Sequence, residues 1–86
     1  MKRRQLLGRL ASGAVRNVSF DDFTGLVRAF GFVLVRKNGS HNIYARPDVE
    51  QLVNLQDVNG QAKPYQIRQF LRLVEKYNLT MEEERD

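Results

Sequence analysis

Residues 19–46 read SFDDFTGLVRAFGFVLVRKNGSHNIYAR, a helix pattern followed by two strand patterns. Ser19 and Asp22 form a variant of the capping box that starts helices. The apolar side chains that follow recur at the i, i+3, i+4, i+7 spacing of a buried helical stripe. Gly31 is placed to end this helix as a C′ glycine. Asp21 and Asp22 could instead form a carboxylate pair for metal or acid–base chemistry, but the cap signature favours a role at the helix start.

The second half of this stretch predicts a β-hairpin. Residues 32–36 are rich in apolar and β-branched side chains, and residues 40–45 form the returning strand. Between them lies Asn38-Gly39, the strongest short-range hairpin signal, for which we expect a type I′ turn.

The remaining elements follow from the same rules. We expect a short amphipathic helix over residues 3–11, a loop over 48–50, a third strand over 52–55 and a polar loop over 57–63. Pro64 opens the last helix at its favoured first position. Whether the helix over 3–11 packs on the body or binds a partner is open at this point. The predicted fold is α+β, with the α-β-β-β-α order of a double-stranded-RNA-binding domain, a three-stranded antiparallel sheet and an extra N-terminal helix.

Composition narrows the chemistry. The 86 residues include no cysteine and a single histidine, His41. Disulfides, a thiol nucleophile, thiolate zinc sites and two-histidine metal sites are therefore excluded. We expect one domain with no metal and no cofactor.

The charge is basic and unevenly distributed. Lysine and arginine total 14 against 10 acidic residues, for a net charge of +4. Glu82, Glu83, Glu84 and Asp86 end the chain, so the body is more cationic than the net charge indicates. Such a field favours polyanions, although small soluble domains often carry a few extra charges.

No stretch reaches the roughly 18 apolar residues that a membrane span needs. Arg9 and Arg16 also interrupt the apolar segment that an export signal would require near the N-terminus. We expect a soluble cytoplasmic protein that binds no membrane.

His41 is the candidate catalytic residue. An imidazole exchanges a proton close to neutral pH, which suits acid–base work at a phosphodiester. Cations lie on both sides of it in the sequence, and we expect RNA contacts from Arg36, Lys37, Gly39, Ser40, Tyr44, Arg46 and Lys63. Gly39 is already explained by the turn, and Ser40 could bond a phosphate or the turn backbone equally well. The proton for the leaving group could come from Tyr44, Lys37 or water.

Strand alternation raises a difficulty for this assignment. His41, Ile43 and Ala45 share one face of their strand, and Asn42 and Tyr44 share the other. If Ile43 points into the core, His41 points the same way, unless it lies at the rim or a bulge intervenes.

The order helix, Gly31-Phe32, apolar strand and Gly39-Ser40-His41-x-Ile43-Tyr44 resembles the HicA-type toxins of type II toxin–antitoxin systems. The resemblance implies a metal-independent mRNA interferase with a double-stranded-RNA-binding-domain-like fold, in which His41 is catalytic. It also implies a HicB-type antitoxin that covers the active site, with DNA bound only indirectly through that antitoxin. We expect a basic helical extension over residues 1–18, a HicA-like domain over 19–79 and an acidic tail over 80–86.

Two other functions remain open on sequence grounds. A non-catalytic RNA- or nucleic-acid-binding module of the same fold would use the same basic face. A protein-interaction domain would bind an acidic partner and would have weak affinity for nucleic acid.

Overall fold

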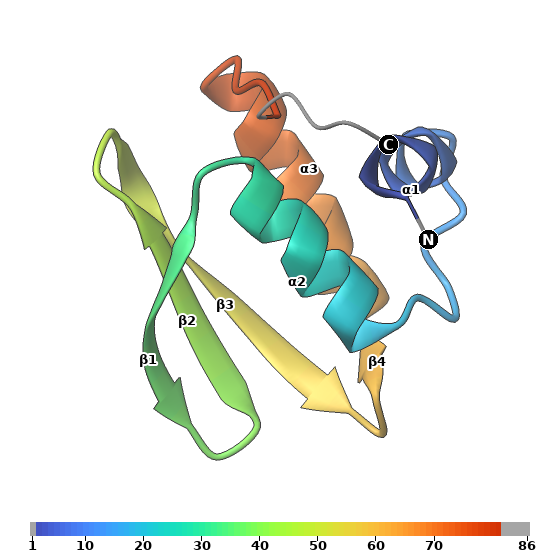
Figure 1. Ribbon diagram of the computed structural model, residues 1–86, viewed down its shortest axis with the longest axis horizontal. Coiled ribbons are helices and arrows are strands. Elements are labelled where there is room, and N and C mark those ends of the chain that lie inside the picture. The colour runs from blue at the N-terminus through green and yellow to red at the C-terminus, as the bar shows by residue number, and fades with distance from the viewer. Residues whose placement is uncertain (1, 82–86) are drawn as a thin grey trace.

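The computed structural model describes residues 2–81 and has the predicted α+β architecture (Figure 1). The elements, in chain order, are α1 (Arg3–Ala11), α2 (Phe20–Ala29), β1 (Val33–Asn38), β2 (His41–Arg46), β3 (Val49–Val58), β4 (Gln61–Ala62) and α3 (Pro64–Lys76). The sheet is antiparallel with the order β1-β2-β3-β4. The expected order is confirmed, with the two-residue β4 as an addition to the three predicted strands.

Helix α2 begins where its cap predicts. The Ser19 hydroxyl accepts a hydrogen bond from the backbone N–H of Asp22 at 3.3 Å. Asp21 and Asp22 lie in the first turn, where their negative charges interact favourably with the positive end of the helix dipole. Gly31 follows the helix with a φ of 90°, a conformation that glycine adopts without strain. The capping interpretation of these acids is therefore the one that the structure supports.

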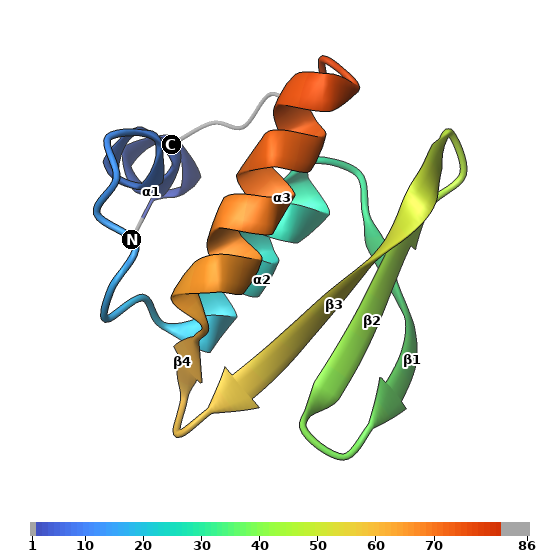
Figure 2. The same ribbon diagram turned by 180° about the vertical axis from the view of Figure 1, so that it is seen from behind.

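The core lies between the helices and one face of the sheet. Phe70 of α3 is its centre, because its ring packs edge-on against Phe23, Phe30 and Phe32 with centroids 5.6–5.7 Å apart. Seen from behind, α3 lies in front of α2 and β3 runs toward β4 beside it (Figure 2). These contacts join α2, α3 and the segment that leads into β1 into one body.

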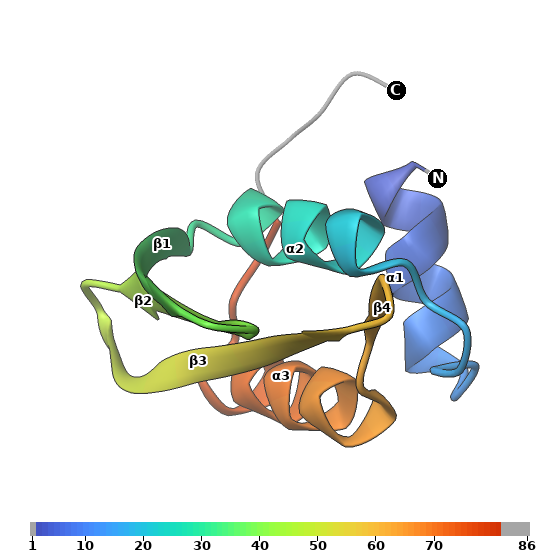
Figure 3. The same cartoon turned by 90° about the horizontal axis from the view of Figure 1, so that it is seen from below.

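Helix α1 is part of this body. Its Leu6 and Leu10 side chains are each 1% exposed and belong to the core cluster. Figure 3 shows α1 beside the beginning of α2, at the end of the molecule away from β1. The question left open by the sequence is thus answered: α1 packs on the body.

Strand β3 is longer than predicted. The loop expected over residues 48–50 is wrong, because Val49 and Glu50 already belong to β3 and Val49 pairs with Arg46 of β2. The loop expected over 57–63 is also partly strand, since Asp57 pairs with Ala62 and Val58 with Gln61. A ten-residue β3 therefore spans the whole sheet and reaches the start of α3.

The two Asn-Gly pairs form turns of different types. At the first hairpin the loop residues are Gly39 and Ser40, and of these only Gly39 has positive φ, at 63°. The type I′ prediction is wrong there, because that turn needs positive φ at both positions; glycine first is the type II′ pattern. The second pair, Asn59-Gly60, has φ values of 53° and 82° between paired residues of β3 and β4, which is the type I′ signature.

Strand β1 is exposed along its whole length although it is apolar. Val33, Leu34 and Val35 are 58%, 41% and 55% exposed, because β1 lies at the edge of the sheet. Its register with β2 shifts between Leu34 and Arg36. Such a bulge bends an edge strand and disfavours pairing with another chain.

Most of the predicted acidic tail, residues 82–86, lies outside the described residues. Within residues 2–81, no helix combines the length and apolar character needed to cross a bilayer.

Candidate functional site

His41 lies on the face of the sheet opposite the core. The core face of β2 carries Asn42 and Tyr44, which are 7% and 2% exposed. Ile43 therefore points away from the core together with His41, and the imidazole is exposed. The difficulty raised by strand alternation disappears, because the assumption that Ile43 fills the core is wrong.

The register of the sheet places polar residues of three strands beside His41. Asn38 of β1 pairs with His41, and His41 pairs with Gln56 of β3. The next row of partners is Arg36, Ile43 and Asn54. Direct partners in an antiparallel sheet share a face, so Arg36, Asn54 and Gln56 lie on the imidazole side.

Both nitrogens of His41 contact amide side chains of β3. The Nδ1 atom lies 3.2 Å from Oδ1 of Asn54, and the Nε2 atom lies 3.3 Å from Nε2 of Gln56. An amide oxygen only accepts and an amide nitrogen only donates. The proton therefore belongs on Nδ1, and the lone pair of Nε2 faces the Gln56 amide.

A second set of contacts fixes Gln56. Its Oε1 accepts from Nζ of Lys63 at 3.2 Å and from Nε2 of Gln66 at 3.4 Å. Its backbone N–H donates to Oε1 of Gln66 at 2.8 Å. Gln66 is 5% exposed, so this part of the network is held in the protein interior. With two donors on its oxygen, the Gln56 amide is oriented with its NH₂ group toward His41.

Among the predicted RNA contacts in residues 2–81, Lys63 alone is hydrogen-bonded to a partner of His41, the side chain of Gln56. Its ammonium also lies 5.1 Å from the ring centroid of Tyr65, whose side chain is 48% exposed. A cation and an exposed aromatic ring thus lie together at the start of α3.

Sequence reasoning missed Asn54, Gln56 and Gln66. Asn54 and Gln56 alternate with the buried Val53 and Leu55, a period-two pattern that places both amides on one face. Gln66 interrupts the apolar stripe of α3, which is the one sign that it has a buried partner. No sequence pattern pairs these residues with His41, because that pairing comes from the register of the sheet.

The other residues near the hairpin divide between the two faces. Arg36 shares the face of His41, whereas Lys37 pairs with the buried Asn42 and faces α2. Lys37, Gly39 and Ser40 line a hollow on the α2 side. Neighbours in sequence are therefore separated by the sheet itself.

The structure contradicts the expectation for Tyr44. Its side chain is 2% exposed on the core face, with the Arg28 guanidinium 5.6 Å from the ring centroid. A buried ring cannot stack on a base, and Tyr44 is too enclosed to deliver a proton on the opposite face. We assign it to the core.

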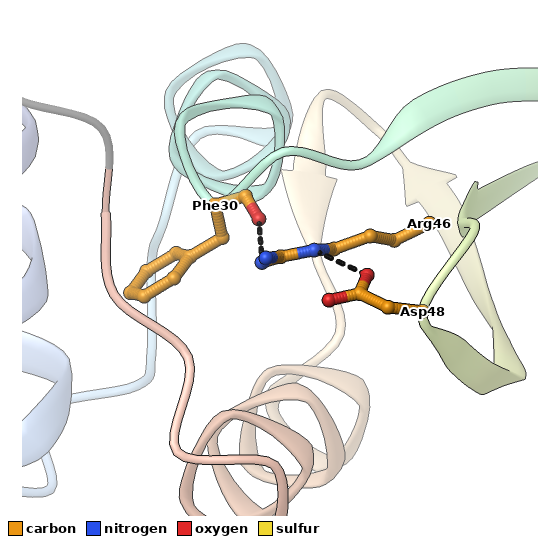
Figure 4. Close-up of polar contacts among 3 residues, drawn as sticks. All are labelled: Phe30, Arg46 and Asp48. Atoms are coloured by element: carbon orange, nitrogen blue, oxygen red, sulfur yellow. Dashed lines mark hydrogen bonds and ion pairs between the residues drawn. The ribbon is translucent and has the colours of Figure 1, made fainter.

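Arg46 lies at the far end of β2 from His41 and serves the fold (Figure 4). Its Nη1 donates to the Phe30 carbonyl at 2.7 Å, and its Nε contacts Oδ1 of Asp48 at 2.7 Å. A cation at the carbonyl end of α2 stabilises that helix terminus. The structure thus does not bring Arg46 to the predicted RNA site.

Across residues 2–81, no three His, Cys, Asp or Glu side chains are grouped where they could share a metal ion.

A comparison with protein families now adds to this geometry. Residues 20–75, well over half of the chain, match the family described as the HicA toxin of bacterial toxin–antitoxin systems. Searches of curated proteins and of solved structures returned no match.

Proposed function

The chain belongs to the HicA toxin family, whose members generally cleave mRNA, and from this we propose that it is an endoribonuclease with His41 as its base. The observation that carries the proposal is the pair of amide contacts on the two ring nitrogens of His41, from which the tautomer follows. A hydrogen on Nδ1 and a lone pair on Nε2 is the arrangement that lets a neutral imidazole accept a proton through Nε2.

The proposed reaction needs no metal, because RNA carries its own nucleophile. Nε2 of His41 takes the proton of a 2′-hydroxyl, and the 2′-oxygen forms a bond to the adjacent phosphorus. The bond from phosphorus to the 5′-oxygen breaks, and that oxygen takes a proton. The products are a 2′,3′-cyclic phosphate and a 5′-hydroxyl end. Since Tyr44 is buried and Lys37 faces α2, water is the remaining donor of this second proton.

The Gln56 amide must leave Nε2 before the reaction begins. In the structure it lies 3.3 Å from the atom that would accept the substrate proton. A substrate hydroxyl can replace it, because that hydroxyl also donates a hydrogen bond to Nε2. Asn54 then continues to hold Nδ1, so the ring keeps its orientation while its other nitrogen reacts.

Cations on the same side of the sheet favour the charge that develops on the phosphate. Arg36 lies on the imidazole face of β1, and Lys63 reaches the Gln56 end of the network. Fixed positive groups at a developing oxyanion lower the barrier to cleavage. We assign these two residues to the phosphate, and the hairpin residues Gly39 and Ser40 to positioning His41.

A toxin of this family acts within a toxin–antitoxin pair, and we propose a HicB-type antitoxin as the partner. The exposed face that carries His41 is the surface it would need to cover. Cytoplasmic mRNA would be the substrate, and DNA would be reached only through the antitoxin.

The test compares wild-type protein, His41→Ala and the control Glu75→Ala on single-stranded RNA in EDTA, with the product ends identified. Glu75 is exposed on α3 and lies outside the network. We expect His41→Ala to lower the cleavage rate by about 10²–10⁴-fold with unchanged thermal stability, and Glu75→Ala to behave as wild type. Equal cleavage by all three proteins, or cleavage abolished by EDTA, would contradict the mechanism.

A further inference from the structure

A cavity of about 300 Å³ lies between β3 and α3, next to the His41 network. Asn54 lines this cavity and also contacts Nδ1 of His41. Gln66 lines it and bonds Gln56, the other partner of the imidazole. The cavity therefore adjoins the amide network that holds the His41 ring, and a group bound in it would lie close to that ring.

The polar lining has an unusual composition. It consists of four amides and two cations: Gln51, Asn54, Gln66, Gln69, Arg72 and Lys76. None of the described residues that line it is acidic. The hollow on the α2 side, in contrast, is lined by Asp21 and Asp57 as well as by cations. The charge of the lining side chains therefore favours an anionic ligand in the cavity between β3 and α3, but not in the hollow on the α2 side.

Several of these polar groups have unused hydrogen-bonding capacity. Among residues 2–81, the side chains of Gln69 and Arg72 make no described hydrogen bond or ion pair. The Gln51 oxygen accepts from the Tyr77 hydroxyl at 2.6 Å, which fixes that amide and leaves its NH₂ group to donate. Leu52, Phe70 and Leu73 supply apolar surface to the same cavity.

Nucleotide recognition uses three kinds of contact: hydrogen bonds to the edge of the base, apolar contact with the flat ring, and cations at the phosphate. The lining of this cavity offers side chains for each of them. The volume is at the lower end of the roughly 300–1,000 Å³ found for small-ligand pockets. We propose that this cavity binds one nucleotide of the RNA, flanking the scissile phosphate. Its base is hydrogen-bonded by Gln69 and Gln51, and its phosphate is held by Arg72 and Lys76. The proposal rests on the proposed ribonuclease function and gives it a site for base preference.

Binding can be tested without cleavage, by titrating isotope-labelled protein with each of the four nucleoside 5′-monophosphates and with ribose 5-phosphate. The observed signals are the side-chain amide NH₂ resonances. We expect at least one nucleotide to shift the Gln51 and Gln69 signals and to bind about tenfold more tightly than ribose 5-phosphate. Equal binding of ribose 5-phosphate, or shifts confined to other amides, would overturn the base site.

Matched variants on one helix separate base from phosphate. Gln69→Leu keeps the size of the side chain but removes its amide, and we expect it to abolish the preference among nucleotides. Arg72→Met should weaken the binding of all four nucleotides to the same extent. Arg68→Met makes the same charge change one helical turn earlier, at a residue that lines a different hollow, and should have no effect. A loss of affinity in Arg68→Met equal to that in Arg72→Met would reduce the effect to net charge and overturn the assignment.

Cleavage then distinguishes this proposal from the one on which it rests. If both hold, Gln69→Leu changes the relative rates of cleavage at different bases, whereas His41→Ala abolishes cleavage at all sites. If His41→Ala still cleaves, the catalytic mechanism fails and the nucleotide titrations stand on their own. If an antitoxin shifts these amides and no nucleotide does, the cavity is a protein-docking site and the present proposal fails.

Discussion

The two faces of strand β3 differ in what they do, although their residues alternate along one chain. Val53 and Leu55 point into the core and are 7% and 1% exposed, whereas Asn54 and Gln56 between and beyond them contact the imidazole. Packing on one face holds the strand in the register that brings the polar groups of the other face together. A shift by one residue would bury the amides and expose the core, so the stability of the fold and the contacts of His41 depend on the same register.

The largest expected effect is a loss of stability from a substitution on the core face of β3. Leu55→Ala removes most of a buried side chain and should lower the free energy of unfolding by about 2–5 kcal/mol, as measured by urea denaturation. At temperatures where the variant is still folded, we expect its cleavage rate to remain near that of wild type. A stable Leu55→Ala protein would mean that this face contributes little to the fold.

The next effect belongs to the adjacent residue on the opposite face. Asn54→Ala removes the acceptor on Nδ1, and we expect cleavage to fall between about tenfold and a hundredfold, because the imidazole loses its orientation. Asn54→Asp retains an oxygen at this position and should preserve more of the activity. Stability of Asn54→Ala should change by less than about 0.5 kcal/mol, since the side chain is exposed. Equal activities of the two variants would exclude the positioning role.

A smaller effect separates a structural arginine from an RNA contact. Arg46→Met should cost about 1–2 kcal/mol of stability, because the Phe30 carbonyl loses a charged donor, and should leave cleavage unchanged. Asp48→Asn removes only the exposed ion pair and should cost less than about 1 kcal/mol. A fall in RNA affinity with no loss of stability in Arg46→Met would restore the sequence-based expectation.

The smallest effect compares two neighbouring cations. Arg36 shares the face of His41 and Lys37 faces α2, so Arg36→Met should weaken RNA binding a few-fold and Lys37→Met should not. The slope of log affinity against log salt should become shallower by about 0.7 in the Arg36 variant alone. Equal losses in both variants would show that RNA responds to net charge and not to the face.

The sequence predicts the helices well because their signals are local. The Ser19 cap and Pro64 at the start of α3 fix the beginnings of two helices within a few residues. The ends of β3 are not predicted, since the pairing of Val49 with Arg46 and of Val58 with Gln61 depends on residues in other strands. The exposure of β1 is likewise a property of its place at the sheet edge.

The candidate site likewise contains residues that the sequence predicts and residues that it does not. His41 is found from the Gly-Ser-His motif, which is contiguous in the sequence. Its amide partners Asn54 and Gln56 come from β3, and Gln66 of α3 holds Gln56 in turn. Only the register of the sheet and the packing of α3 bring these residues together. Tyr44 and Arg46 were predicted from proximity in sequence, and alternation across the sheet and distance along β2 place them elsewhere.

Helix α1 has a practical consequence for anyone who would shorten this protein. The family match begins at residue 20, and a chain started at Ser19 would retain the complete polar network around His41. It would lose Leu6 and Leu10, however, and would leave the part of α2 that they cover open to water. A boundary drawn where the family match begins therefore preserves the contacts of His41 but divides the core, and the smallest unit expected to fold on its own includes α1.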